Sequence, residues 1–324
     1  MATPRFPAAR DMKGPGLSHW VFFFARRRLI CGLFGQTEAG RGEEAPRRGY
    51  ASNAFWEDPV NRLKGKNIIV TGAARGMGQS IADDLVQEGG NVVYADMDAS
   101  VTDVAASVAS RIDTGAAGRA IGMKADVTKR EEVKALVAKC VSEFGSLDIM
   151  FNNAGVNKPL NFLDVTDENW DFIMKVNAYG VLIGTQEAAR QMISQGKGGK
   201  IINTASIAGR QGYDNIAPYC ASKFAVISLT QSAARAFAKD NITVNGFAPG
   251  VVNTPLWEKL DLDLMEIGAS EKPGQAIEAF SAGILRGRAA TAKDIVGTTT
   301  YMASGDSDYM TGQIIMIDGG MVLL

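Results

Sequence analysis

Residues 66–78 read KNIIVTGAARGMG, and this stretch decides the fold class of the chain. Residues 68–70 form a short apolar run of the kind that makes a strand buried on both faces of a sheet. The glycines at Gly72, Gly76 and Gly78 permit a tight turn and let a helix begin close to the strand. A strand, a glycine-rich turn and a helix in this order predict the first unit of a parallel, doubly wound sheet.

The same alternation of short apolar runs and helical patterns continues to the end of the sequence. We predict an α/β fold with one doubly wound parallel sheet of about seven strands, helices on both faces and a small helical insertion at about 255–285. No second domain boundary follows residue 64, so residues 64–324 are predicted to form a single domain. The helix predicted at about 128–143 has Thr128 as a suitable N-terminal cap. Further strands are predicted at 92–95, 119–125, 147–151, 201–202, 242–247 and 314–317, and further helices at about 77–89, 98–112, 167–195, 217–239 and 292–303.

The composition excludes several classes of function. The chain of 324 residues is 46% apolar, and its 34 basic residues nearly balance 35 acidic ones, which gives a net charge of −1. That balance provides no basic surface for nucleic acid or an anionic membrane. The apolar runs are also shorter than the ~20 residues that span a bilayer. We therefore expect a soluble globular protein with no nucleic-acid or membrane partner.

Histidine and cysteine are scarce. The single histidine, His19, lies in a stretch that we place outside the fold, so no residue is left for a Ser-His-Asp triad or a histidine-ligated zinc site. The three cysteines, Cys31, Cys140 and Cys220, lie far apart and have no C-x-x-C spacing. They indicate a reducing compartment and no metal site.

Residues 1–63 differ from the rest of the chain. They are rich in proline, glycine and arginine, contain ten basic and six acidic residues, and show no helical or strand period. We predict that this extension is disordered or a targeting segment. An inert tail, a mitochondrial presequence cleaved near residues 48–52 and an export signal after Arg26–Arg28 are the alternatives. We expect a cytoplasmic location, or the mitochondrial matrix if residues 1–50 are a presequence.

The glycine-rich turn and one acidic residue together indicate a dinucleotide site. Gly72, Gly76 and Gly78 would let backbone amides approach a pyrophosphate at the positive end of the following helix. Asp96 ends the next predicted strand, where a carboxylate accepts hydrogen bonds from the adenosine ribose. The same charge repels a 2′-phosphate, so NAD is favoured over NADP, although the neighbouring Arg75 acts in the opposite sense.

A phenol and an ammonium lie four residues apart in the helix predicted at 217–239. Tyr219 and Lys223 would share one face of that helix. Bringing a phenol from a pKa of ~10 towards ~7 requires roughly 4 kcal/mol, which the ammonium and a nicotinamide cation could supply. Ser206 follows the fifth predicted strand, at the sheet edge where open α/β folds bind ligands, and its hydroxyl could hold a reacting oxygen.

These motifs occur in a familiar order. Residues 71–78, 152–155 (NNAG), Ser206, Tyr219 with Lys223, Pro249-Gly250 and Asp318-Gly319-Gly320 together resemble the classical short-chain dehydrogenases/reductases over residues 64–324. The resemblance implies a Rossmann-type fold and an NAD(P)-dependent oxidoreductase. It implies that Tyr219 is the general acid/base, that Ser206 positions the substrate oxygen and that Lys223 binds the nicotinamide ribose. Asn177 matches the asparagine that holds a proton-relay water; the alternative is a packing amide in a kinked helix.

The resemblance also implies cofactor contacts from all of these motifs, with Asp126-Val127 near the adenine and the loop after Pro249 over the nicotinamide. They are Gly72, Arg75, Gly76, Met77, Gly78, Asp96, Asp126, Val127, Asn153, Ala154, Gly155, Tyr219, Lys223, Pro249, Gly250, Val252 and Thr254.

Other stretches resemble a narrower group. Residues 255–258 (PLWE), 307–312 (SDYMTG) and the Gly320-Met321 pair are most similar to bacterial polyol and acetoin/2,3-butanediol dehydrogenases. This implies a small vicinal diol, hydroxyketone or sugar alcohol as substrate, and a homotetramer. The predicted substrate contacts are Ser206, Ile207, Tyr219 and Trp257. Ile207 is apolar where such enzymes tend to have a polar residue, which favours a less polar alcohol as substrate. Trp257 has two alternative roles: it lines the pocket under a lid at 255–285, or it packs within its own helix.

Three alternatives have different sequence requirements. A ketoacyl-thioester reductase would share the catalytic set, but Asp96 disfavours its usual NADPH. A nucleotide-sugar epimerase normally has another glycine spacing and a longer C-terminal domain. A cofactor-binding regulator without turnover would not need Ser206, Tyr219, Lys223 and Asn177 together.

Overall fold

The computed structural model describes residues 61–112 and 118–323, all within one compact unit. These residues form seven strands in one parallel sheet of order β3-β2-β1-β4-β5-β6-β7. The order reverses between β1 and β4, which creates the crevice where doubly wound sheets bind ligands. The prediction of a doubly wound parallel sheet is confirmed. The strands are β1 (Asn67–Thr71), β2 (Asn91–Asp96), β3 (Ala120–Lys124), β4 (Ile149–Asn152), β5 (Gly199–Thr204), β6 (Ile242–Pro249) and β7 (Ile314–Ile317).

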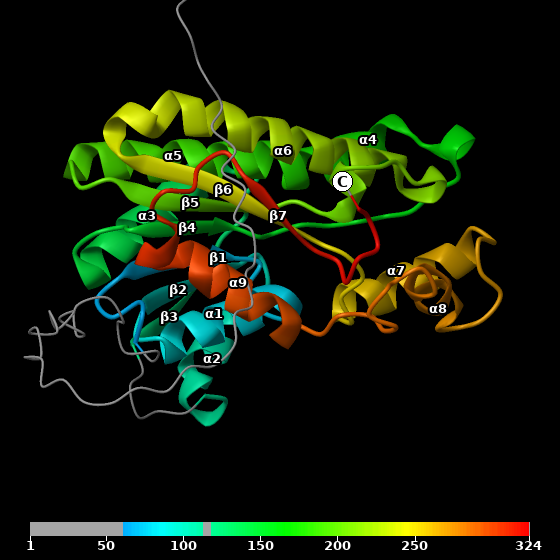
Figure 1. The fold of residues 1–324 in the computed structure, drawn as a ribbon, viewed down its shortest axis with the longest axis horizontal. Helices are drawn as coiled ribbons and strands as arrows, with labels where there is room; N and C mark the ends of the chain where they lie inside the picture. Colours follow the sequence, from blue (N-terminus) through cyan, green and yellow to red (C-terminus); the bar gives the residue numbers. More distant parts are fainter. Residues whose placement is uncertain (1–60, 113–117, 324) are drawn as a thin grey trace, which may run out of the picture. The chain divides into compact units, whose positions relative to one another are not determined.

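Helices cover both faces of the sheet, with α1, α2 and α9 on one side and α3, α5 and α6 on the other (Figure 1). Helices α7 and α8 form the predicted insertion, apart from these two layers. The α-helices are α1 (Gly76–Gln87), α2 (Val101–Ala106), α3 (Arg130–Phe144), α4 (Asp167–Met174), α5 (Gly180–Gln195), α6 (Ala217–Phe237), α7 (Pro255–Glu266), α8 (Gln275–Ser281) and α9 (Lys293–Ala303). Short 3₁₀ turns are η1 (Val108–Ser110), η3 (Phe162–Asp164), η5 (Ile207–Gly209), η6 (Asp214–Ile216), η7 (Ala238–Asp240) and η8 (Gly305–Ser307), and η4 (Lys175–Tyr179) is a π-helical turn.

Successive residues of the central strand β1 face opposite layers. Ile68 and Val70 belong to the core that includes α1 and α9, whereas Ile69 belongs to the core that includes α3 and α5. All three side chains are fully buried. Because burying one such side chain contributes about 1.5–3 kcal/mol, an uninterrupted apolar run holds both helical layers onto the sheet.

Residues just before the predicted boundary at residue 64 are packed against the sheet domain. Leu63 is fully buried, and the Arg62 guanidinium pairs with the Glu88 carboxylate at 2.9 Å. The extension predicted at residues 1–63 lies, up to residue 60, outside the described residues. So do His19, Cys31 and the three interpretations of that segment. Among the described residues, no helix is long and apolar enough to cross a membrane.

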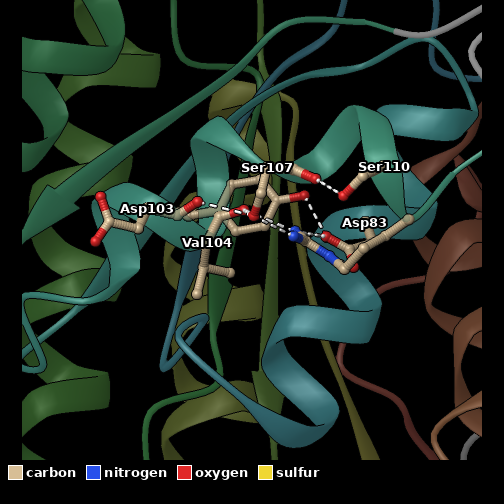
Figure 2. Close-up of polar contacts among 7 residues, drawn as sticks. Asp83, Asp103, Val104, Ser107 and Ser110 are labelled. Atoms are coloured by element: carbon tan, nitrogen blue, oxygen red, sulfur yellow. Dashed lines mark hydrogen bonds and ion pairs between the residues drawn. The ribbon is translucent and has the colours of Figure 1, made fainter.

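The helix predicted at 98–112 is shorter and irregular. It divides into α2 and η1, because the hydroxyls of Ser107 and Ser110 donate hydrogen bonds to backbone carbonyls one turn earlier (Figure 2). The Arg111 guanidinium then bonds Asp83 in α1 at 2.8 Å and 2.9 Å, and the same carboxylate accepts from the Tyr94 hydroxyl at 2.8 Å. Serine hydroxyls compete with the helical backbone in this way, so the chain leaves the helix and turns toward α1.

The predicted cap of the third helix is wrong. Helix α3 begins at Arg130 after Lys129, which makes no side-chain cap. Thr128 instead donates through both its amide and its hydroxyl to the Asp126 carboxylate, at 2.9 Å and 2.8 Å. The aspartate two residues earlier captures the threonine in a local turn, which delays the helix.

Candidate active site

The glycine-rich turn after β1 has the geometry of a phosphate-binding loop. Gly72 and Gly76 have φ values of +69° and +61°, a backbone conformation that favours glycine. A Cβ on Gly78 would lie 2.0 Å from the carbonyl oxygen of Gly72, so a side chain cannot be accommodated there. The turn therefore leads tightly into α1, whose first amides have no side-chain cap from Arg75. These free donors suit the pyrophosphate of a dinucleotide.

Asp96 lies beside that turn at the end of β2. One carboxylate oxygen accepts from the Ala74 amide at 3.1 Å, and the other accepts from the Asp98 amide at 3.0 Å. The carboxylate is thus fixed against the glycine turn while each oxygen retains a lone pair. Asp126 follows β3 next to it, since the Ala125 amide bonds the Asp96 carbonyl at 2.8 Å. The two predicted adenosine-side acids are adjacent.

The NNAG segment is held against the end of β1. The amides of Asn153 and Ala154 donate to the Thr71 hydroxyl at 2.9 Å and 3.1 Å, and the Asn153 side chain donates to the Thr71 carbonyl at 2.9 Å. A Cβ on Gly155 would lie 3.5 Å from Asn177 Oδ1 and 3.7 Å from Lys223 Nζ. Gly155 therefore links the cofactor crevice to the predicted catalytic group.

The loop after β6 completes this crevice. Thr254 lies over the glycine turn, since its Cβ would be 3.6 Å from a Cβ on Gly76. Val252 is buried, and its carbonyl accepts from the Thr254 hydroxyl at 3.2 Å. The predicted cofactor residues from the ends of β1, β2, β3, β4 and β6 thus meet at one edge of the sheet, and they fit a nicotinamide dinucleotide. Among the described residues, no cluster of metal-ligating side chains occurs.

Lys223 lies close to the Tyr219 ring, and both residues belong to α6. Its Nζ lies 5.5 Å from the centre of the Tyr219 ring and donates to the Thr204 carbonyl at 2.8 Å. The side chain is 3% exposed, and burial lowers the pKa of Lys223 to about 8. An ammonium has three donors, and the hydrogen bonds among the described residues use one of them. The other two can serve the hydroxyls of a ribose.

Tyr219 does not acquire a low pKa from the protein alone. Burial raises the pKa of Tyr219 to about 12, and the polar Ser206 hydroxyl nearby only partly offsets this. Lys223 and a nicotinamide cation are predicted to lower this pKa together. In the protein by itself, the cost of burying a phenolate dominates the pKa of Tyr219.

Asn177 occupies the π-helical turn between α4 and α5. Its fully buried side chain accepts from the Val156 amide at 2.8 Å, donates to the Val156 carbonyl at 2.9 Å and donates to the Ser222 hydroxyl at 3.1 Å. Both N–H groups therefore bond to the protein. The side chain holds the segment after NNAG against α6, and it offers a water only one remaining oxygen lone pair. The helix predicted at 167–195 is bulged where this amide lies.

A cavity of about 50 Å³ lies beside Tyr219. Three of the predicted substrate contacts, Ile207, Ser206 and Trp257, line it together with Tyr219. The Trp257 and Phe280 rings meet edge to face with centroids 5.4 Å apart, and Tyr213 lies 5.6 Å from Phe280, so α7 and α8 close the cavity. Trp257 thus both lines the cavity and packs. The remaining lining residues are Asn157, Ala208, Tyr213, Ile216, Gly250, Leu256, Leu260 and Phe280.

Asn157, Tyr213 and Phe280 were not predicted as site residues. They lie in loops or in α8, outside the motifs from which the site was predicted. Tertiary packing brings them to the cavity, so local sequence patterns could not identify them.

Known proteins share this architecture and sequence. A family model described as short chain dehydrogenase matches residues 66–264. The chain is 40% identical to a diacetyl reductase, (S)-acetoin forming, of Staphylococcus epidermidis, over 79% of this chain and 98% of that protein. It is 39% identical to a galactitol 2-dehydrogenase of Agrobacterium fabrum, over 80% of this chain and 98% of the relative. A crystal structure of a short-chain type dehydrogenase/reductase from Mycobacterium marinum superposes with a TM-score of 0.72 at 33% identity, covering 81% and 97% of the two chains.

The predicted resemblance to polyol and acetoin dehydrogenases is therefore confirmed, and with it the binding of a nicotinamide cofactor. The chain belongs to the short-chain dehydrogenase family and is an NAD(P)-dependent oxidoreductase that interconverts secondary alcohols and ketones.

Proposed function

We propose that this protein interconverts a small diol, hydroxyketone or sugar alcohol and its ketone with NAD, and that Tyr219 is the general acid/base. The observation that carries this proposal is the small cavity with Ser206 and Tyr219 on one wall and Lys223 behind them. Its volume of about 50 Å³ suits a substrate of a few carbon atoms rather than a long acyl chain.

The proposed mechanism assigns one task to each side chain. When bound, the nicotinamide cofactor supplies or accepts the hydride. The Ser206 oxygen accepts from the Ala208 amide at 3.1 Å, so its proton is free to bond to the substrate oxygen. Tyr219 gives its phenolic proton to that oxygen in reduction and takes the hydroxyl proton in oxidation. Lys223 holds the ribose with its unused donors and favours the phenolate.

Asn177 is proposed to support this proton transfer. By holding Val156 and Ser222, it fixes the segment and the helix turn on either side of the crevice. The lone pair left on its oxygen is the group that would order a relay water. Asn177 is thus proposed to have two roles: it holds the relay water, as predicted, and it positions the backbone next to the cavity.

The choice of NAD rests on Asp96. Its fixed carboxylate can accept from the ribose hydroxyls and would repel a 2′-phosphate. Arg75 is exposed beside the same turn and is the feature that favours NADPH. We infer NAD because two hydrogen bonds hold the Asp96 carboxylate at the turn, where its charge would meet a 2′-phosphate before the exposed Arg75 side chain could order around it.

A homotetramer is also part of the proposal. Helices α4 and α6 carry the half-exposed apolar side chains Trp170, Phe172 and Phe224. A groove formed by α4, η4, α5 and α6 is lined by Asp171, Met174, Lys175, Ala178, Tyr179, Leu182 and Leu229. Apolar patches of this kind are typical of protein interfaces. The strand β7 at the sheet edge supplies a second surface that a symmetric assembly could use.

We propose a cytoplasmic location, with the mitochondrial matrix as the alternative if residues 1–50 are cleaved. The free, buried thiols Cys140 and Cys220 support a reducing compartment. Comparing the cellular location of the full chain with that of residues 51–324 tests this proposal; an export of the full chain would contradict both locations.

The function is tested by following nicotinamide absorbance with secondary alcohols, vicinal diols, sugar alcohols and ketoacyl thioesters, each with NAD and NADP. We expect turnover of a small diol or hydroxyketone with NAD, and we expect Tyr219→Phe to reduce kcat by at least about 100-fold while NADH still binds. Preference for NADPH with a ketoacyl thioester would instead identify a thioester reductase. Cofactor binding without any turnover would identify a regulator.

A further inference from the structure

Asn157 has an unsatisfied polar atom in the wall of the substrate cavity. The residue is 9% exposed, and its Oδ1 is buried without a hydrogen-bond partner among the described residues. Leaving a buried acceptor unpaired costs about 1–3 kcal/mol, and such groups in native proteins generally require an explanation. Because this oxygen belongs to a residue that lines the same cavity as Ser206 and Tyr219, a bound substrate is the partner that the site provides for.

The backbone on both sides of Asn157 is fixed. Asn177 bonds the amide and the carbonyl of Val156 at 2.8 Å and 2.9 Å. The buried Asn169 of α4 donates to the carbonyl of Lys158 at 3.1 Å. The backbone of residue 157 therefore cannot move away from the cavity without breaking these bonds. A fixed backbone keeps the Asn157 side chain in the cavity wall, which is one part of preorganising it for a ligand.

The other residues that line the cavity provide few hydrogen-bond partners for a second substrate oxygen. Ser206 and Tyr219 are committed to the reacting oxygen, and the Tyr213 hydroxyl accepts from Gln211 at 2.6 Å, which leaves it mainly as a donor to a substrate oxygen. The lining also includes the apolar Leu256 and Phe280, so the buried Asn157 Oδ1 is the acceptor that a substrate hydroxyl proton can reach without displacing a protein hydrogen bond. A sugar alcohol would bury several hydroxyls here without partners, whereas a simple alcohol would leave Asn157 unpaired.

We propose that Asn157 is a specificity-determining residue whose carboxamide oxygen accepts a hydrogen bond from a substrate hydroxyl on the carbon next to the reacting carbon. This inference rests on the proposed function and narrows it. The substrate is then a small α-hydroxyketone and its vicinal diol, with one oxygen for Ser206 and Tyr219 and one for Asn157.

The test compares 3-hydroxybutan-2-one with butan-2-one, which share a carbon skeleton and differ in one hydroxyl. The wild type should prefer the hydroxyketone. The variant Asn157→Leu should lose on the order of 10-fold in kcat/KM for the hydroxyketone, chiefly through KM, while its kcat/KM for butan-2-one should change several-fold less. Asn157→Asp keeps an acceptor oxygen of nearly the same shape and should keep most of the preference.

Several results would overturn the inference. Equal losses on both ketones in Asn157→Leu, or a fall in Tm that accounts for them, would mean that Asn157 only supports the fold. An unchanged preference in that variant, or a wild type that prefers a six-carbon sugar alcohol, would leave the proposed function standing without this role for Asn157. A wild type that reduces neither ketone and oxidises no diol would refute the proposed function itself.

Discussion

Lys223 illustrates how a residue that we propose to bind the cofactor can oppose folding. Its ammonium is 3% exposed, donates to the Thr204 carbonyl, and has a pKa that burial lowers to about 8 from 10.5. Between these two values the unfolded chain binds more protons than the folded one, so the free energy of unfolding rises with pH across this interval. Below pH 8 the cost of the buried charge is present in full.

We therefore expect Lys223→Met to abolish turnover and yet to raise the Tm near neutral pH. The gain should be less than about 3 kcal/mol, because the lost hydrogen bond to Thr204 offsets part of it. The gain should shrink as the pH rises through 8 towards 10.5, where the wild-type lysine becomes neutral in the folded state. Thermal melts of both proteins across this pH range provide the measurement.

The exposed Lys66 supplies the control, since Lys66→Met removes a charge that is already hydrated. Its Tm difference from the wild type should stay small and show no comparable change with pH. A Lys223→Met variant that is less stable than the wild type at neutral pH would contradict the argument.

At the scale of single residues, the sequence predicts those site residues that belong to recognisable motifs. Ser206, Tyr219 and Lys223 lie at fixed positions relative to a strand end and a helix, so their proximity follows from topology. The direction in which the Tyr219 pKa shifts cannot be predicted from the sequence, because it depends on how completely the ring is buried. Asn157 also escapes prediction, since its position depends on Asn169 and Asn177 in a distant helix.

At the scale of elements, the Asp83 carboxylate on α1 connects α1 to β2 and to the segment that follows α2. Asp83 accepts from Arg111 and from the buried Tyr94 hydroxyl, and burial together with this acid raises the pKa of Tyr94. Tyr94 lies on the same strand as Asp96, two residues earlier. The network therefore stabilises the strand that carries the predicted ribose contact.

We expect Arg111→Met to lower the free energy of unfolding by about 1 kcal/mol, because Asp83 and the end of η1 lose a bidentate partner. Urea unfolding monitored by circular dichroism measures this change. The matched variant Lys134→Met removes an exposed pair with Glu131 on α3 and should cost much less. Equal effects of the two substitutions would show that the Arg111 contacts add nothing specific.

Elements themselves are well predicted, but their ends are not. Each predicted strand and helix of the sheet occurs, because buried apolar runs and amphipathic periods extend over several residues. The start of α3 and the break after α2 depend on single side chains, Thr128 and Ser107, that bond the nearest carboxylate or carbonyl. Periodicity does not reveal which of these local bonds forms.

At the scale of the whole molecule, the described residues leave apolar side chains on α4 and α6 facing outward. Phe172 is 48% exposed and Phe224 is 47% exposed, beside the groove that contains Leu182 and Leu229. Charges placed in a self-associating surface separate the subunits, because each charge would have to be buried without a partner.

We expect the double substitution Phe172→Glu with Phe224→Glu to reduce the molar mass measured by light scattering from that of a tetramer to that of a dimer or monomer. The control Leu262→Glu, on the outer side of α7 where the side chain is 54% exposed, should leave the mass unchanged. A wild type that is monomeric at all concentrations would contradict the proposed assembly.

The two buried asparagines that flank Asn157 have a consequence for protein engineering. Because Asn169 and Asn177 secure the main chain on either side, position 157 can accept different side chains while the scaffold around it keeps its shape. Saturation mutagenesis of position 157 alone should then yield folded variants with altered substrate specificity. Randomising either flanking asparagine should mostly yield variants that misfold.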